Sequence, residues 1–184
     1  LDRSVMTLGG PSPKIKLDKP KEFKLKNGIR VLVVENHKLP RINYSLRFDR
    51  KPIVEGEKTG VISLLGSMLG NGTTNIPKDD FNEEVDFLGA GINVGFGSGF
   101  AFTLTKNNER VLDLFSDAFI NPLLTEEEFV KEKDKLIEGL KTQKKDIDAI
   151  SSRVGDALSY GKNHVYGEFI SETTINNITF QDIL

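Results

Sequence analysis

The spacing of apolar residues changes near Gly60, and this change restricts the folds open to the chain more than any other feature. Residues 43–48 alternate between polar and apolar side chains, as in a strand with one buried face. After Gly60 the apolar residues recur at the spacing of a helix with one buried face. They are Val61, Leu64, Leu65, Met68 and Leu69. The chain therefore contains both strands and helices.

Earlier and later segments extend this pattern. Asn27-Gly28 between the apolar runs 23–25 and 29–34 predicts a hairpin in which both turn residues have positive φ. Further strands are predicted at 91–96 and 100–105. Helices are predicted at 78–88, 109–119, from the capping box at Thr125 to about residue 147, at 150–160, and from Thr179 onward.

Strands and helices are mixed without strict alternation, which predicts the α+β class: a mixed, mainly antiparallel sheet covered by helices. The 184 residues suffice for one ordinary domain. Residues 1–20 carry Gly and Pro without periodicity and are expected to form an extended lead-in or linker. Residues 21–184 are then the folded domain.

Composition excludes several classes of function. The absence of Cys excludes a cysteine zinc site, an iron–sulfur cluster and thiol catalysis. A net charge of −2 argues against nucleic-acid binding. No apolar run approaches the roughly 18 residues of a membrane span. The two histidines, His37 and His164, are far apart in the chain and are expected to have surface or hydrogen-bonding roles.

The glycine-rich segments do not fit phosphate-binding loops. Residues 66–74 contain no Lys and end a helix, whereas a phosphate loop precedes one. Residues 95–99 lie between predicted strands and lack the dinucleotide spacing. The lysines at 141, 144 and 145 follow a helix and are expected to be solvated.

Several segments together resemble a known family. FKLKNGIRVLVV (23–34), GVISLLGSMLGNGT (60–73), FLGAGIN (87–93) and FVKEKDKLIEGL (129–140) are similar, in order and spacing, to landmarks of the pitrilysin/insulinase zinc metallopeptidases, metallopeptidase family 16. HVYG (164–167) and ITFQD (178–182) continue the similarity. The resemblance implies the N-terminal domain of that family, of the pitrilysin and mitochondrial-processing-peptidase type. It also implies that the domain is truncated on its C-terminal side and that further domains occur in the full-length chain.

Active members of this family carry an inverted zinc motif, His-x-x-Glu-His, on the first helix and a further Glu ligand on the long helix. On this sequence the two His positions correspond to Ser63 and Ser67, the catalytic Glu to Gly66, and the Glu ligand to Gly139. Only Glu132, an acidic supporting position, is retained. The resemblance therefore implies an inactive homologue, not an enzyme, that binds no zinc and needs no cofactor.

The family's two-subunit members imply a role for such a chain. It would pair with an active zinc-peptidase homologue and help to enclose an extended peptide for proteolysis. The peptide-binding edge strand would be Gly91, Ile92, Asn93 and Val94, because backbone pairing needs no particular side chain. The alternative is that Ile92, Val94 and Phe96 form an inward face and that the nearby glycines permit close packing.

Two other functions stay open at this point. One is a protein-binding or scaffolding module without a role in proteolysis. The other is a residual hydrolase that uses Ser63 or Ser67 with Glu132, although no His is close in sequence to activate either Ser. The Pro-rich lead-in favours the bacterial periplasm or cell envelope as the compartment, with the cytoplasm and the mitochondrion as alternatives.

Overall fold

The computed structural model describes residue 10 and residues 19–184, so the predicted lead-in 1–20 lies almost wholly outside the described residues. The chain divides into two compact units, residues 1–39 and 40–184. The prediction that 21–184 form one domain stays a prediction. In the first unit, β1 (Lys21–Lys24) pairs antiparallel with β2 (Arg30–Val33).

The turn of this hairpin corrects one sequence prediction. Gly28 has φ 93°, but no described residue other than glycine has positive φ, so the prediction for Asn27 is wrong. Leu25 N–H donates to the Ile29 carbonyl at 2.8 Å, and Gly28 N–H donates to the Leu25 carbonyl at 3.0 Å. The connection is therefore longer than two residues, and only its glycine must be left-handed.

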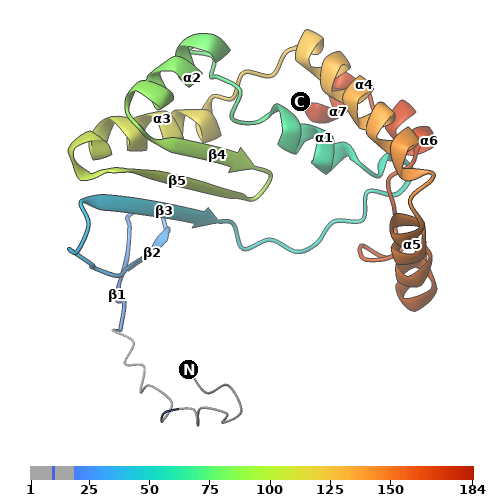
Figure 1. Ribbon diagram of the computed structural model, residues 1–184, viewed down its shortest axis with the longest axis horizontal. Helices are drawn as coiled ribbons and strands as arrows, with labels where there is room; N and C mark the ends of the chain where they lie inside the picture. The colour runs from blue at the N-terminus through green and yellow to red at the C-terminus, as the bar shows by residue number, and fades with distance from the viewer. Residues whose placement is uncertain (1–9, 11–18) are drawn as a thin grey trace, which may run out of the picture. The chain divides into compact units, whose positions relative to one another are not determined.

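The second unit is built around a three-stranded antiparallel sheet (Figure 1). β5 (Ser98–Leu104) is central, with β3 (Arg41–Arg47) on one side and β4 (Gly91–Gly95) on the other. Exposed and half-buried residues alternate along β3, as its sequence predicts. A two-residue turn, Phe96-Gly97, joins β4 to β5.

One face of the sheet is covered by α2 (Lys78–Phe87) and α3 (Asn108–Ile120) (Figure 1). Between them lies the first core, whose buried members come from both helices and from β4 and β5. They are Phe81, Val85, Val94, Ala101, Val111, Leu114, Phe115 and Ala118. A side chain at Gly99 would collide with the Phe119 ring, so a bare backbone is needed there.

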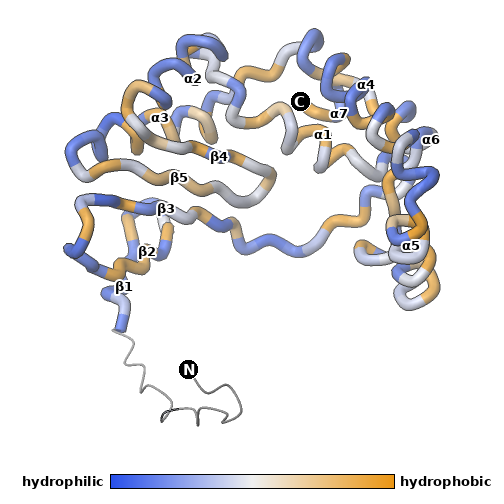
Figure 2. Tube along the Cα trace, in the orientation of Figure 1, coloured by the Kyte–Doolittle hydropathy of each residue, from blue (hydrophilic) through white to orange (hydrophobic). Residues whose placement is uncertain are grey.

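A second core joins four helices: α1 (Val61–Met68), α4 (Glu126–Gln143), α6 (Glu172–Asn176) and α7 (Phe180–Ile183). Its buried members are Leu64, Met68, Phe129, Leu140, Ile175, Ile178 and Ile183. Figure 2 shows hydrophilic segments along α2 and α4 and apolar segments in α1 and α7. The predicted apolar face of α1 is confirmed, because Leu64 and Met68 are both buried.

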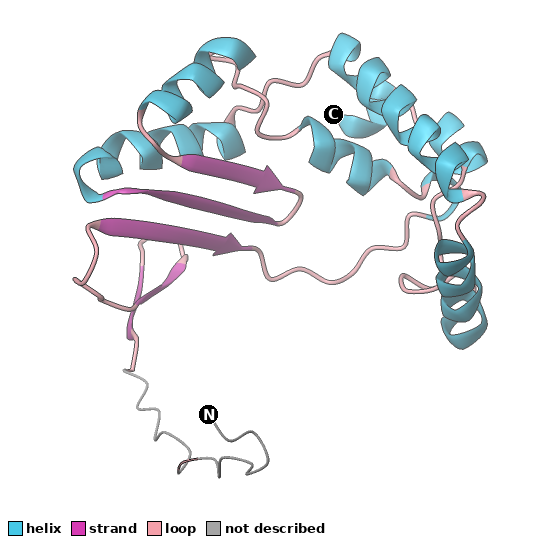
Figure 3. Cartoon of the chain, viewed as in Figure 1, coloured by secondary structure: helices cyan, strands magenta, loops and turns pink. Residues whose placement is uncertain are grey.

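Local capping decides where the later helices begin and end (Figure 3). α4 ends at Gln143, and α5 (Ile147–Tyr160) begins after Asp146, whose Oδ1 accepts from the Asp148 N–H at 3.0 Å. The long helix is thus shorter than predicted and the next one longer. No helix of the described residues is both long and apolar enough to cross a membrane.

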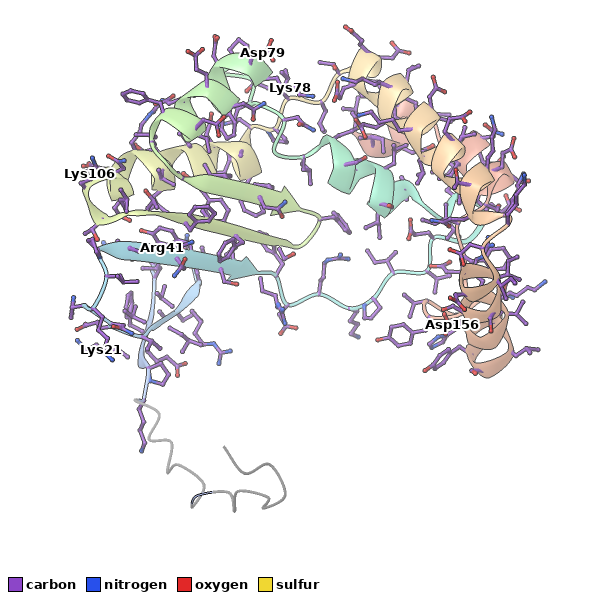
Figure 4. All side chains as sticks on the ribbon, in the orientation of Figure 1. Lys21, Arg41, Lys78, Asp79, Lys106 and Asp156 are labelled. Carbon is purple, nitrogen blue, oxygen red and sulfur yellow. The ribbon has the colours of Figure 1, made fainter. Side chains whose placement is uncertain are left out.

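The predicted capping box of α4 is only half formed. Thr125 Oγ1 accepts from the Glu128 N–H at 3.3 Å, as expected. The Glu128 carboxylate, however, accepts from Lys78 Nζ at 2.8 Å, and this ion pair links the start of α2, where Figure 4 labels Lys78, to α4. The Lys78 hydrogen bond lowers the pKa of Glu128. A tertiary partner has replaced the local one.

Candidate functional site

Three of the positions that correspond to the family's zinc motif lie on one stripe of α1. Each residue of a helix is rotated by about 100° from the last, so Ser63, Gly66 and Ser67 point away from the buried Leu64 and Met68. Ser63 and Ser67 are exposed, and a Cβ at Gly66 would meet no atom within 4 Å. Ser67 Oγ donates to the Leu64 carbonyl at 2.8 Å. The stripe is open to solvent and its only side-chain groups are hydroxyls.

The remaining two positions lie on α4, which shares the second core with α1. Gly139 is exposed, and a Cβ there would also meet nothing within 4 Å. Glu132 is two helical turns earlier, on the same face of α4. Its side chain is only 13% exposed and forms an ion pair with Lys135, which raises the pKa of that lysine.

The residues present do not fit a zinc ion. Zinc in proteins is held by thiolate, imidazole and carboxylate groups. Of the five positions that the resemblance assigns to the site, two offer only a hydroxyl, two offer no side chain, and Glu132 alone offers a carboxylate, which is paired with Lys135. Within the part of the chain that the structure describes, no group of three or more His, Cys, Asp or Glu side chains could hold a metal ion.

The two histidines lie elsewhere. His164, on the loop after α5, stacks against Tyr160, and its Nδ1 accepts from the Tyr166 N–H at 3.2 Å. His37 is in the first unit, with Nε2 at 3.6 Å from a Glu35 carboxylate oxygen. Both have the hydrogen-bonding or surface roles expected from the sequence. A hydrolase built on Ser67 gains no support, since its hydroxyl donates to a backbone carbonyl and Glu132 is held by Lys135.

The predicted peptide-binding segment, Gly91 to Val94, lies in β4 at one edge of the sheet. Because Gly95 and Ser98 close a two-residue turn, they form a hydrogen-bonded pair, and such pairs alternate along the ladder. The peptide groups of Ile92 and Val94 therefore point away from β5. Gly70, just after α1, lies beside this edge, since a Cβ there would be 3.6 Å from Val94 N.

The side chains of Ile92 and Val94 follow the alternative given above, whereas Phe96 lies in the β4–β5 turn against the Arg50 guanidinium and is not part of the first core. Val94 is 4% exposed within the first core, and Ile92 packs against that core. Asn93 is exposed on the opposite face. Inward-facing side chains and an outward-facing backbone edge coexist, because side chains stand perpendicular to the plane in which strands pair.

Two carboxylates that the sequence analysis did not single out fix the start of α1. Glu55 Oε2 accepts from the N–H groups of Gly60 at 3.0 Å and Ile62 at 2.9 Å. The Glu168 carboxylate accepts from the N–H groups of Glu55 at 3.1 Å and Gly56 at 3.0 Å. It also accepts from Thr59 Oγ1 at 3.3 Å. The two carboxylates thus hold the turn that sets the direction of α1.

The same turn is joined to the end of the chain. Lys58 Nζ donates to the Asp182 carboxylate, which also accepts from the Thr179 N–H at 2.8 Å. These bonds, the one from Lys58 foremost, lower the pKa of Asp182 to about 2. No periodic signal marks such contacts, because their members are more than 100 residues apart in sequence.

Comparison with solved structures identifies the fold. The chain is similar to a peptidase M16 inactive domain from Pseudomonas fluorescens, with a TM-score of 0.80 and 21% identity over 90% of this chain and 42% of that one. It is also similar to a protease from Helicobacter pylori, with a TM-score of 0.74 and 22% identity over 91% of this chain and 42% of that one. The fold is therefore that of a peptidase M16 domain, and the chain spans about two fifths of the length of these relatives.

The sequence comparison leads to the family. The model of the insulinase family, peptidase family M16, matches residues 52–165, more than half of the chain. The chain belongs to the insulinase (peptidase M16) family, which confirms the resemblance and the predicted α+β fold. No curated protein sequence matches the chain.

Proposed function

We propose that the chain is a non-catalytic member of the peptidase M16 family that binds extended peptides and serves an active homologue. One observation carries the proposal: the helices that would form a zinc site are packed together, while the positions of the three zinc ligands and the catalytic Glu hold only Ser and Gly. Leu64, on the buried face of α1, has no exposed surface, so the scaffold is kept where the chemistry is lost. The similar domain from Pseudomonas fluorescens is itself described as inactive.

Peptide binding is proposed at the β4 edge. Among the described residues, the N–H groups of Ile92 and Val94 donate neither to a side chain nor to a backbone group outside the sheet. An extended peptide placed there would add a strand and satisfy them. This mode of binding relies on backbone hydrogen bonds, so it is compatible with loss of the zinc ligands.

The partner is proposed to be an active, zinc-containing M16 homologue. This chain spans 42% of the length of each similar structure, so a complete chamber would need a further domain or subunit. The peptide held at β4 would then be cleaved by the partner's metal site. The chain itself would contribute binding and enclosure.

Zinc content is the first test. The purified chain is loaded with zinc, desalted and measured by elemental mass spectrometry, and we expect no stoichiometric zinc. About one zinc per chain, removed by a chelator, would overturn the non-catalytic assignment. Adding the chain to an active homologue should lower the KM for peptide hydrolysis, whereas the chain alone should give no hydrolysis.

Strand pairing has its own test. A fluorescent peptide is N-methylated on alternate amides in two versions, one with the odd and one with the even amides blocked. Because only every second amide of an added strand donates to β4, one version should bind as the parent does and the other should not. Equal binding of the two versions would contradict pairing at the β4 edge.

A scaffolding role without proteolysis is the second candidate, and an apolar stripe on α5 favours it. Ile147 is 80% exposed, Val154 52% and Leu158 83%, and α5 has no buried residue. A partner that binds this stripe, and whose binding is lost in Leu158→Glu without any change in peptide affinity, would support the scaffold.

A further inference from the structure

A cleft of about 550 Å³ lies in the second unit, lined by the β4–β5 turn, by the end of β3 and the segment that follows it, by the start of α1 and by the loop before α6. The β4–β5 turn contributes Phe96 and Gly97, and the start of α1 contributes Ile62. The last residue of β3 and the segment after it contribute the cationic residues. These are Arg47, Arg50 and Lys51. The cleft therefore begins where the β4 edge ends.

Arg50 is held in one position at the mouth of this cleft. Its guanidinium carbon lies 4.0 Å from the centroid of the Phe96 ring, and Nη2 donates to the Phe96 carbonyl at 3.0 Å. Gly97, with φ 89°, lets the guanidinium approach the backbone, because a Cβ there would overlap Arg50 Nε. An arginine fixed in this way loses little side-chain entropy when it binds a further group.

The cations around the cleft are available to bind a ligand, whereas its carboxylates are already hydrogen-bonded. None of the three cations forms an ion pair with a carboxylate of the residues that the structure describes. The two carboxylates of the lining, Glu55 and Glu168, already accept hydrogen bonds from backbone N–H groups. The cleft thus presents three cations that form no ion pair within the described part of the chain, together with two carboxylates that already accept backbone hydrogen bonds. Such a surface is complementary to an added carboxylate.

We propose that this cleft binds a carboxylate of an acidic peptide whose extended segment pairs with the β4 edge. The inference rests on the proposed function and adds a substrate class to it: peptides with an Asp or Glu side chain beyond the segment that pairs with Ile92 and Val94. Arg50 makes the charged hydrogen bond, and Arg47 and Lys51 strengthen the local positive potential.

The test compares two peptides that differ only in charge. An extended peptide with Glu at three consecutive positions and its Gln counterpart, both amidated at the C-terminus, are titrated by fluorescence anisotropy against the 184-residue chain. We expect the Glu peptide to bind at least about tenfold more tightly, a difference of about 1.4 kcal/mol. The difference should shrink as salt is raised, because these cations are exposed.

Protein variants assign the effect to the cleft. Arg50→Ala should weaken binding of the Glu peptide about tenfold and leave the Gln peptide unchanged. Arg50→Lys, which keeps the charge but not the planar stacking, should give an intermediate loss. Lys106→Ala is the matched control: Lys106 is an exposed lysine just after the far end of β5, labelled in Figure 4, and its loss should not alter either affinity.

The outcomes separate the two levels of the proposal. Equal affinity for the Glu and Gln peptides, with alternate N-methylation still discriminating, would overturn the cleft and leave strand pairing intact. The same loss in Lys106→Ala as in Arg50→Ala would also overturn it, because net charge alone would then explain the effect. Failure of both peptides to bind would overturn the inference together with the proposed function.

Discussion

Restoring the ligands of the family's metal site should convert this chain into a zinc-binding protein. The perturbation is a quadruple variant: Ser63→His, Gly66→Glu, Ser67→His and Gly139→Glu. All four positions are open, since the two serines are exposed and a Cβ at either glycine meets no atom within 4 Å. The two His side chains would lie one turn apart on one face of α1, the spacing of a two-histidine zinc motif.

The free energies favour a folded variant. Replacing a helical Gly by Glu contributes about 0.5 kcal/mol at each site from helix propensity. A new negative charge near the end of α1 costs a similar amount. The free energy of unfolding without metal should therefore stay within about 1 kcal/mol of the parent chain. Zinc at one hundred times its dissociation constant adds about 2.7 kcal/mol, which should raise Tm by roughly 5–10 °C.

Zinc content is measured by elemental mass spectrometry, and Tm is measured by thermal unfolding with and without zinc. We expect about one zinc per chain in the variant and a zinc-dependent rise in Tm. A control variant with Ser67→Gln in place of Ser67→His should show neither. A quadruple variant that folds like the parent and yet binds no zinc would refute the assignment of these helix positions.

Three further outcomes follow from the packing and charges of the second unit. Glu55→Ala should lower the free energy of unfolding by about 1–2 kcal/mol in urea titrations, because α1 loses its cap, whereas Glu57→Ala should change it by less than about 0.5 kcal/mol. The pKa of Asp182 is about 2 in the folded chain, below the pKa of the unfolded chain, so its ionised carboxylate stabilises the fold above the unfolded pKa and this stabilisation is lost as pH falls toward 2. NMR titration of the Asp182 carboxyl carbon should show this low midpoint, and Asp182→Asn should make the free energy of unfolding less dependent on pH in acid. Leu64→Ala should lower the free energy of unfolding by about 2–5 kcal/mol, because Leu64 is fully buried, whereas Leu158→Ala, at a site 83% exposed, should lower it by less than about 0.5 kcal/mol. Equal losses in the two variants would contradict the second core.

Several site assignments remain predictions that the fold does not test. The absence of bound zinc, the peptide at β4 and the periplasmic or envelope compartment are of this kind. The structure does show where the residues involved lie: Ser63, Gly66 and Ser67 on an open stripe of α1, and Gly139 at an exposed position of α4. The resemblance assigned these positions. The exposure of the three on α1 could be expected because a helix repeats every 3.6 residues, so a buried face determines an exposed one.

Sequence alone determined the type and order of most elements and which of their faces are buried. The reason is that the spacing of apolar residues follows the local geometry of a helix or a strand. The buried Leu64 and Met68 were predicted in this way. Only the tertiary structure decided which distant groups meet: Glu168 with the turn before α1, and Lys78 with Glu128 at the cost of a local cap. It also decided that Arg50 lies over Phe96. Such contacts depend on how packed elements bring side chains together across long stretches of sequence, and no local spacing encodes that distance.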